Sequence, residues 1–356
     1  MNPLGAAGHI AGRAAETVAR ETVYAQRRQA VTARAQEMAG QLHAQVATRP
    51  QTALVQSREI IAGDTVLKYN YTFLKRFACW GTDHEVVTAA LWAAATHARH
   101  KDGTPVWQYC PRLGIFGPSG SGKSWKARLI GKLAYRPEIL IEPTKPAFID
   151  LCADKHTIIL TEADEAFRSP GRSRGILAVV NGSYQPDVSA SKVRGGVALR
   201  IPLYTFVVLD GIDTLLSANR PDLHAMISRC IILKARKAPA GYRPPRFDGQ
   251  ARLIAERLGT LGSAWMGQEV EDGIAEDYPR IPEHVGNRPF ALWEPLFAVA
   301  WRADAAWREE QGEPEGEGPW SAACRAACEQ LEAVSPDQDD DGMSELDRQM
   351  AEWLGE

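Results

Sequence analysis

One glycine-rich segment constrains the fold of this chain more than any other feature. It consists of Gly117, Pro118, Ser119, Gly120, Ser121, Gly122, Lys123 and Ser124, and it fits the pattern G-x-x-x-x-G-K-[ST]. An apolar run at residues 113–116 leads into it, and an amphipathic segment at 125–133 follows. In such a strand–loop–helix unit, glycines let backbone N–H groups face the phosphates of a nucleotide, and the helix N-terminus adds positive charge. We expect a phosphate-binding loop (P-loop); the alternative is a glycine-rich turn with a structural role only.

ATP and Mg²⁺ are the ligands that this motif predicts. Lys123 would place its ammonium group at the β- and γ-phosphates, and Ser124 would offer its hydroxyl to Mg²⁺. A hydrolytic site also needs an acidic residue at the end of a neighbouring strand. The segment 157–165 is the best candidate, because an apolar run ends there in several carboxylates.

The acidic segment departs from the commonest arrangement, in which Asp and then Glu follow the apolar residues. Thr161 occupies the position of the Asp, and Glu162 keeps the position from which a carboxylate activates water. We expect Asp164 to reach the metal from one turn further on. The alternative is a strand that ends in a solvated acidic loop.

Further polar residues mark the ends of other strands. Asp210 follows the run 206–209 and is either a γ-phosphate sensor or an ordinary strand-to-loop Asp. Arg229 precedes the run 230–233, where ring-forming ATPases carry an Arg that acts in a neighbouring subunit's site. Arg220 competes for this role, and each arginine could equally be an ordinary surface residue.

The distribution of short apolar runs predicts the fold class. Runs at 113–116, 139–141, 158–160, 206–209 and 230–233 are separated by segments long enough for helices. This pattern is typical of a parallel sheet buried on both faces, which predicts an α/β fold with a P-loop nucleotide-hydrolase core. The six cysteines form no C-x-x-C pair, which fits free thiols in a cytoplasmic protein. No apolar run is long enough to span a membrane.

Composition divides the chain into five predicted segments. Residues 1–62 are predicted to form a helical arm with arginines every seven residues, from Arg13 to Arg34. The arginines form a solvated face on a packed helix, or the helix is a DNA-contacting arm or an oligomerisation helix. Residues 63–110 are a helical lead-in, 111–237 the core and 238–308 a helical lid. Residues 309–356 are an acidic, largely disordered tail with a short helix near 344–354. The tail has 15 acidic and 2 basic residues, so the rest of the chain carries about +10 and suggests a polyanionic partner.

Several segments together resemble a known family. They are the P-loop, Ile-Leu-Thr-Glu-Ala-Asp at 159–164, Val-Leu-Asp-Gly-Ile-Asp at 208–213, Ser-Arg-Cys-Ile-Ile-Leu at 228–233 and the stretch at 287–300. The chain resembles, over about residues 73–307, P-loop ATPases with the domain of unknown function 3631, which occur in actinobacteria, phages and plasmids beside primase or helicase modules. The resemblance implies an AAA+-like or RecA-like core with a helical lid, in which Arg288 contacts the γ-phosphate. The family usually has Asp where this chain has Thr161.

The resulting hypothesis is a cytoplasmic, Mg²⁺-dependent ATPase of a mobile genetic element that acts on DNA as an oligomer, such as a ring. The basic segment 168–194, which contains Tyr184, is a candidate groove for single-stranded nucleic acid; a solvated surface loop is the alternative. Two other functions stay open. One is an ATP-gated loader or switch with little turnover, suggested by Thr161, and the other is a small-molecule kinase.

Overall fold

A computed structural model describes residues 61–168, 170–194, 197–216, 221–276, 281–282 and 285–332. The chain divides into two compact units, Met1–Glu59 and Ile60–Glu356, and the description concerns the second. The predicted basic arm lies outside the described residues, apart from its last two positions. So does the predicted short helix near 344–354.

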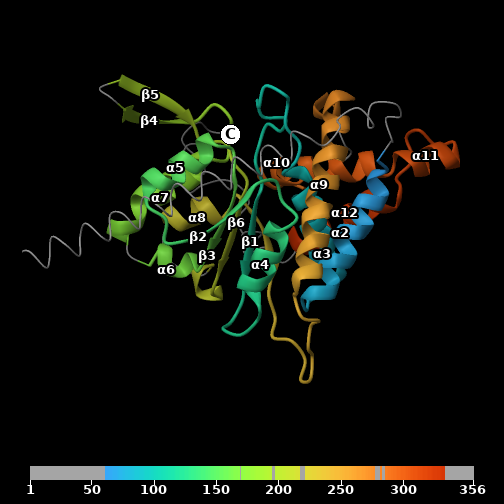
Figure 1. The fold of residues 1–356 in the computed structure, drawn as a ribbon, viewed down its shortest axis with the longest axis horizontal. Helices are drawn as coiled ribbons and strands as arrows, with labels where there is room; N and C mark the ends of the chain where they lie inside the picture. Colours follow the sequence, from blue (N-terminus) through green and yellow to red (C-terminus); the bar gives the residue numbers. More distant parts are fainter. Residues whose placement is uncertain are drawn as a thin grey trace, which may run out of the picture. The chain divides into compact units, whose positions relative to one another are not determined.

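A parallel sheet of five strands forms the centre of the second unit (Figure 1). Its order is β2-β3-β6-β1-β7, and every neighbouring pair is parallel. All five predicted apolar runs are strands of this sheet, so the α/β class is confirmed. The strands are β1 (Arg112–Phe116), β2 (Pro137–Ile141), β3 (Thr157–Thr161), β6 (Val207–Gly211) and β7 (Cys230–Lys234).

Alternate residues of the central strands enter two separate hydrophobic cores. In β6, Val208 belongs to one core, whereas Val207 and Leu209 belong to the other. Because side chains of a strand alternate between its faces, helices must cover both faces. The first core is built with α2 (Gly63–Phe77), α3 (Asp83–Ala95), α4 (Lys123–Gly131), α9 (Gly249–Glu271), α10 (Asn287–Ala303) and α12 (Pro319–Glu332). The second is built with α5 (Lys145–Ala153), α6 (Ala163–Ala166), α7 (Pro170–Gly182) and α8 (Pro221–Ile227).

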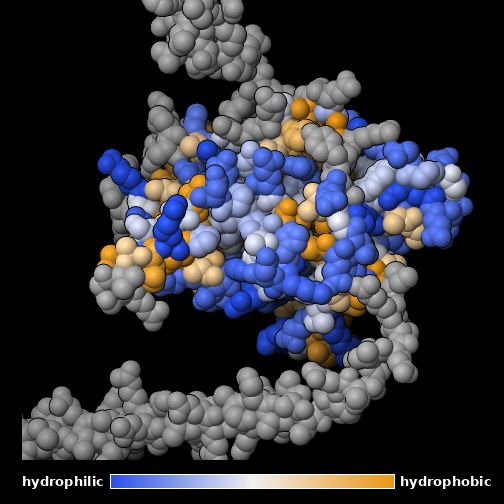
Figure 2. All heavy atoms as spheres, turned by 90° about the horizontal axis from the view of Figure 1, so that it is seen from above, coloured by the Kyte–Doolittle hydropathy of each residue, from blue (hydrophilic) through white to orange (hydrophobic). Residues whose placement is uncertain are grey.

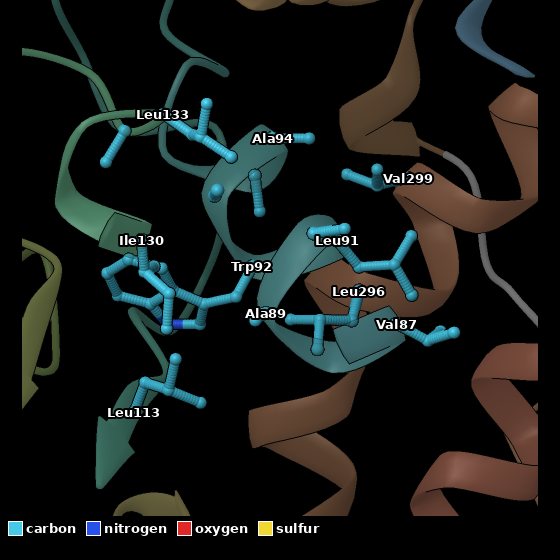
Figure 3. Packing of buried hydrophobic residues seen from close by; sticks show 14 of the residues in the cluster. Val87, Ala89, Leu91, Trp92, Ala94, Leu113, Ile130, Leu133, Leu296 and Val299 are labelled. Atoms are coloured by element: carbon cyan, nitrogen blue, oxygen red, sulfur yellow. The ribbon is translucent and has the colours of Figure 1, made fainter. Parts of the chain in front are cut away.

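Helix α3 is the centre of the first core. Almost its whole length is buried, and Trp92 has no exposed surface. Figure 3 shows Leu296 of α10 on one side of α3 and Ile130 of α4 with Leu113 of β1 on the other. The Trp92 indole donates a hydrogen bond of 2.8 Å to the Pro111 carbonyl, which fixes α3 to the start of β1. A helix that is apolar all round is expected in such a central position.

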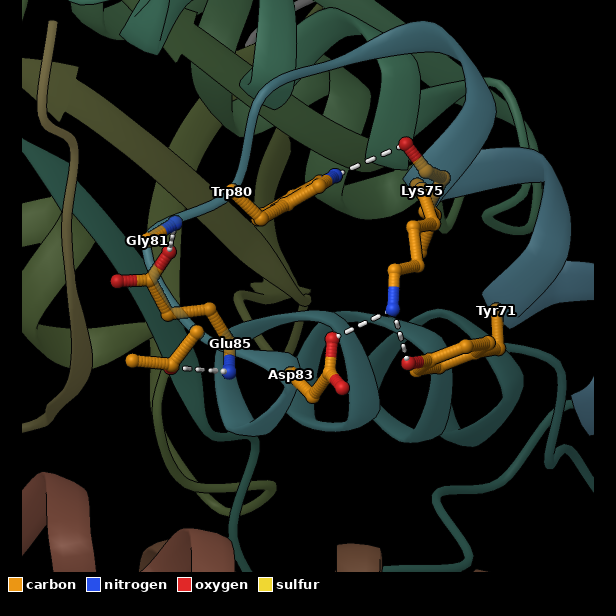
Figure 4. A network of polar contacts seen from close by, with 8 residues as sticks. Tyr71, Lys75, Trp80, Gly81, Asp83 and Glu85 are labelled. Carbon is orange, nitrogen blue, oxygen red and sulfur yellow. Dashed lines mark hydrogen bonds and ion pairs between the residues drawn. The ribbon is translucent and has the colours of Figure 1, made fainter. Parts of the chain in front are cut away.

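Polar contacts fix the link between α2 and α3 (Figure 4). The Lys75 ammonium group lies 2.8 Å from the Asp83 carboxylate and 3.1 Å from the Tyr71 hydroxyl. The Glu85 carboxylate accepts the Gly81 amide at 3.0 Å. Helix α4 is joined to the end of α2 by a separate bond, in which the Trp125 indole donates to the Phe77 carbonyl at 2.7 Å.

Strand β2 differs from the expectation of a sheet buried on both faces. It is an edge strand, and Ile139 and Ile141 are 45% and 56% exposed. Figure 2 shows one face of the surface, where hydrophilic side chains predominate and hydrophobic ones gather in separate patches. No helix among the described residues is both long and apolar enough to cross a bilayer. All six cysteines are free.

The C-terminal region also differs from its predicted organisation. Helices α11 (Ala305–Gln311) and α12 lie in the segment 305–332, and α12 packs against α3 and α10. Trp320, Cys324 and Cys328 are buried, and the Asp304 carboxylate accepts the Trp320 amide at 2.9 Å. The prediction of disorder from residue 309 is therefore wrong for residues 309–332. Although this segment is acidic overall, α12 has one apolar face that packs in the core. The segments predicted as a lead-in and a lid contact each other, since α9 packs on α2 and α10 packs on α3.

Candidate nucleotide-binding site

The loop between β1 and α4 is sharply curled. Gly120 and Gly122 have φ angles of 77° and 75°, a left-handed conformation that favours glycine. The Gly117 amide donates to the Gly211 carbonyl at 3.2 Å, and a Cβ on Gly117 would overlap the Ala235 carbonyl. These contacts fix the start of the loop between β6 and the segment after β7. The sequence pattern therefore forms the strand–loop–helix unit that it predicts.

The N-terminus of α4 faces the open side of this loop. No side chain caps the helix, and Gly120 and Gly122 have no neighbouring atom within 4 Å of the position of an added Cβ. The residues from Pro118 to Gly120 are exposed. Uncapped amides and the helix dipole both favour an anion at such a position. Lys123 begins α4, is half-buried, and forms no hydrogen bond or ion pair with any described residue.

Ser124 and Asp210 form the closest polar contact of the site. The Ser124 hydroxyl donates to the Asp210 carboxylate at 2.7 Å. Strand β6 places this carboxylate next to the loop, because it is paired with β1 and Asp210 lies opposite Ile115. Burial raises the pKa of Asp210, while the Ser124 hydrogen bond, the Glu162 backbone and the charges of Lys123 and Arg128 act in the opposite direction.

The Asp210 carboxylate has one oxygen without a partner. Its Oδ2 is buried and makes no hydrogen bond with a described residue, which is unusual for a buried carboxylate. Within the described ranges, no group of three or more His, Cys, Asp or Glu side chains forms a metal site by itself. Mg²⁺ commonly binds one or two carboxylates together with substrate phosphates and waters. Ser124 and Asp210 fit this requirement, whereas the sequence by itself predicts Asp210 only as a possible γ-phosphate sensor or an ordinary strand-to-loop Asp.

The residues after β3 lie at the same edge of the sheet, one strand further from the loop. Glu162 is exposed and has φ 58° and ψ 45°, a conformation that costs a non-glycine residue about 1 kcal/mol. The Asp164 carboxylate accepts a hydrogen bond from the Ile212 amide at 3.3 Å. The carboxylate that contacts Ser124 is that of Asp210. The Thr161 hydroxyl donates to the Leu140 carbonyl at 3.2 Å and is directed at β2.

The candidate arginines lie elsewhere. Arg229 comes directly before β7, and the first residues of β7 and β1 are paired, so Arg229 lies at the edge of the sheet opposite the loop. Its guanidinium group lies 5.7 Å from the centre of the Tyr184 ring and donates to the Ala225 carbonyl. It could act in a nucleotide site only if that site belonged to another copy. Arg288 lies in the first turn of α10, but its side chain and all of Arg220 are outside the described residues.

The segment 168–194 is not the flexible loop that its composition predicts. It contains helix α7 and strand β4 (Ser189–Arg194), which forms a separate antiparallel hairpin with β5 (Val197–Pro202). Tyr184 is 6% exposed, stacks on Tyr109, and lies beneath Arg112 and Arg229. It is therefore unavailable to stack on a nucleic-acid base. The glycines and serines of this stretch favour a loop, whereas apolar residues of α7 pack in the second hydrophobic core and stabilise residues 170–182 as a helix.

No family model matches the chain, and no curated protein is significantly similar in sequence. The assignment of function therefore depends on the residues and their geometry.

Proposed function

We propose that this chain binds and hydrolyses ATP with Mg²⁺ at residues 117–124, on a P-loop core of the AAA+ or RecA type. The observation that carries the proposal is the Ser124–Asp210 contact at the start of an uncapped helix, directly after a left-handed glycine loop. A hydroxyl, a carboxylate and a lysine at one helix N-terminus suit a Mg²⁺-bound triphosphate.

Each residue of the site has a distinct task in this proposal. The amides of the loop and of α4, with Lys123, hold the phosphates. Ser124 and Asp210 would hold Mg²⁺, which would neutralise phosphate charge. Glu162 orients the attacking water, and its exposed position at the same edge of the sheet supports this role. Asp164 stays a weaker metal candidate because its carboxylate is bonded to the Ile212 amide.

Slow turnover is the second candidate behaviour, and one observation favours it. Thr161 occupies the usual acidic position, and its hydroxyl bonds to β2 instead of facing the loop. A chain without that carboxylate suits an ATP-gated loader or switch. Hydrolysis measured in single-turnover and multiple-turnover experiments separates this behaviour from that of a fast ATPase.

The finer proposal is a cytoplasmic, DNA-directed oligomeric ATPase of a mobile genetic element. It rests on the family resemblance, the positive charge outside the acidic tail, and the position of Arg229. In a ring, Arg229 of one copy would exchange its contact with Tyr184 for the nucleotide of a neighbour. Arg288, in the first turn of α10, would act as the γ-phosphate sensor.

Two substitutions test the proposed site. Lys123→Ala should abolish ATP binding, and Asp210→Asn should lower the Mg²⁺ dependence of binding while preserving the Ser124 hydrogen bond. Lys145→Ala, at an exposed lysine on α5, is the matched control. Binding is measured by titration calorimetry and hydrolysis by phosphate release. ATP binding by Lys123→Ala at the level of the unmodified chain would refute the proposal.

A further inference from the structure

A basic loop leaves the sheet at the last residue of β7. Residues 234–247, here called the basic loop, contain five Lys or Arg residues and no Asp or Glu. The five basic residues are all exposed: Lys234, Arg236, Lys237, Arg243 and Arg246. Arg236 has the Glu85 carboxylate as an electrostatic neighbour, whereas the other four cations form no ion pair with a described residue. Such a concentration of positive charge indicates a polyanionic ligand.

The loop also carries an exposed aromatic residue between its charges. Tyr242 is 38% exposed and lies beside Arg243, just after Gly241 with φ 83°. Three prolines, at 239, 244 and 245, restrict the backbone and lower the entropy lost on binding. In Figure 1 the segment is the golden loop that extends below α9. Cations with an exposed aromatic ring are the features that bind phosphates and stack on unpaired bases.

Both ends of the basic loop contact the candidate nucleotide site. At its start, the Ala235 amide donates to the Phe116 carbonyl at 2.7 Å, next to Gly117. At its end, the Phe247 ring packs against Trp125, with ring centres 5.2 Å apart. Trp125 follows Ser124 in helix α4. A ligand on the basic loop would therefore lie beside the nucleotide site and share its supports.

We propose that the basic loop binds single-stranded nucleic acid, with its cations on the phosphates and Tyr242 stacked on a base. The proposal rests on the proposed DNA partner, and it replaces the segment 168–194 as the contact surface. An acidic peptide suits the loop less well, because it would satisfy the charges but leave Tyr242 without a role. The contacts at Phe116 and Trp125 would couple nucleic-acid binding to the phosphate-binding loop.

The test compares two triple substitutions in the full chain. Lys237→Gln, Arg243→Gln and Arg246→Gln remove three charges from the basic loop. The control, Lys68→Gln, Lys101→Gln and Lys145→Gln, removes three charges from exposed lysines elsewhere. Binding to labelled oligothymidine of about 20 nucleotides is measured by fluorescence anisotropy over a range of salt concentrations. The loop variant should bind at least about tenfold more weakly, and its salt-dependence slope should fall by about 2, since each phosphate contact contributes about 0.7.

Substitutions of Tyr242 test whether base stacking contributes to binding in addition to the charges of the basic loop. Tyr242→Ala should weaken binding about tenfold, whereas Tyr242→Phe should preserve it, because stacking needs only the ring. Lys123→Ala should still bind the oligonucleotide, so failure of the ATP site and failure of this proposal are distinguishable. Equal losses in the loop and control variants would overturn the proposal. So would equal binding of poly-glutamate and oligothymidine, which would indicate a general surface for acidic chains.

Discussion

The buried His97 should make the free energy of unfolding depend measurably on pH. The imidazole is 6% exposed, and its Nε2 lies 2.8 Å from the Leu133 carbonyl oxygen. A carbonyl can only accept, so Nε2 carries the proton and Nδ1 accepts from the Ser263 hydroxyl, also at 2.8 Å. The neutral ring thus joins the end of α3 to α9 and to the residues after α4. Burial lowers the pKa of His97 from 6.5 to about 4.

The size and sign of the effect follow from this shift. Between pH 4 and 6.5 the unfolded chain binds a proton at His97 that the folded chain does not. The free energy of unfolding therefore rises with pH, and the contribution of His97 is lost as the pH falls from 6.5 toward 4. Lowering the pKa from 6.5 to about 4 corresponds to about 3 kcal/mol of unfolding free energy, of which about 2 kcal/mol is lost at about pH 5.

The assay compares the unmodified chain with His97→Gln by urea unfolding followed with tryptophan fluorescence. The glutamine does not titrate, and its amide can still donate to Leu133. The difference in unfolding free energy between the two proteins should shrink by about 3 kcal/mol between about pH 7.5 and about pH 4. Ser263→Ala should lower stability but keep the slope, because the imidazole remains. A difference independent of pH would refute the reasoning.

Three further perturbations test the structure around the site and at the C-terminus. Thr161→Asp should not raise ATP turnover and should lower the free energy of unfolding by more than about 2 kcal/mol. The reason is that a buried carboxylate would face a carbonyl of β2. Faster phosphate release by this variant would contradict the prediction. Trp320→Ala should cost about 3 kcal/mol in urea unfolding, whereas Glu329→Ala on the exposed side of α12 should change it little. Gly117→Ala should weaken ATP binding in calorimetry at least about tenfold, since the added methyl would displace the loop; unchanged affinity would show that the loop tolerates the shift.

The sequence alone determined the local units around the site. Glycines at 120 and 122, a preceding apolar run and a following helix are sufficient to specify a strand–loop–helix unit, because left-handed φ angles and strand and helix preferences are short-range properties. The apolar runs likewise specified the strands of the parallel sheet, and for β1, β3 and β6 the reason is that strands buried on both faces need continuous apolar residues. These elements required no knowledge of the partners that they meet in space.

The tertiary structure alone decided which distant residues meet. Strand order places β6 beside β1, and so brings Asp210 to Ser124 while Thr161 faces β2. No local pattern contains this order, because it results from pairing between strands that are far apart in the sequence. The burial of Tyr184 and of one face of α12 also results from contacts between distant segments. The polar composition of these segments indicates which residues face solvent, but it does not show which apolar residues pack in the core, because that depends on the other elements of the fold.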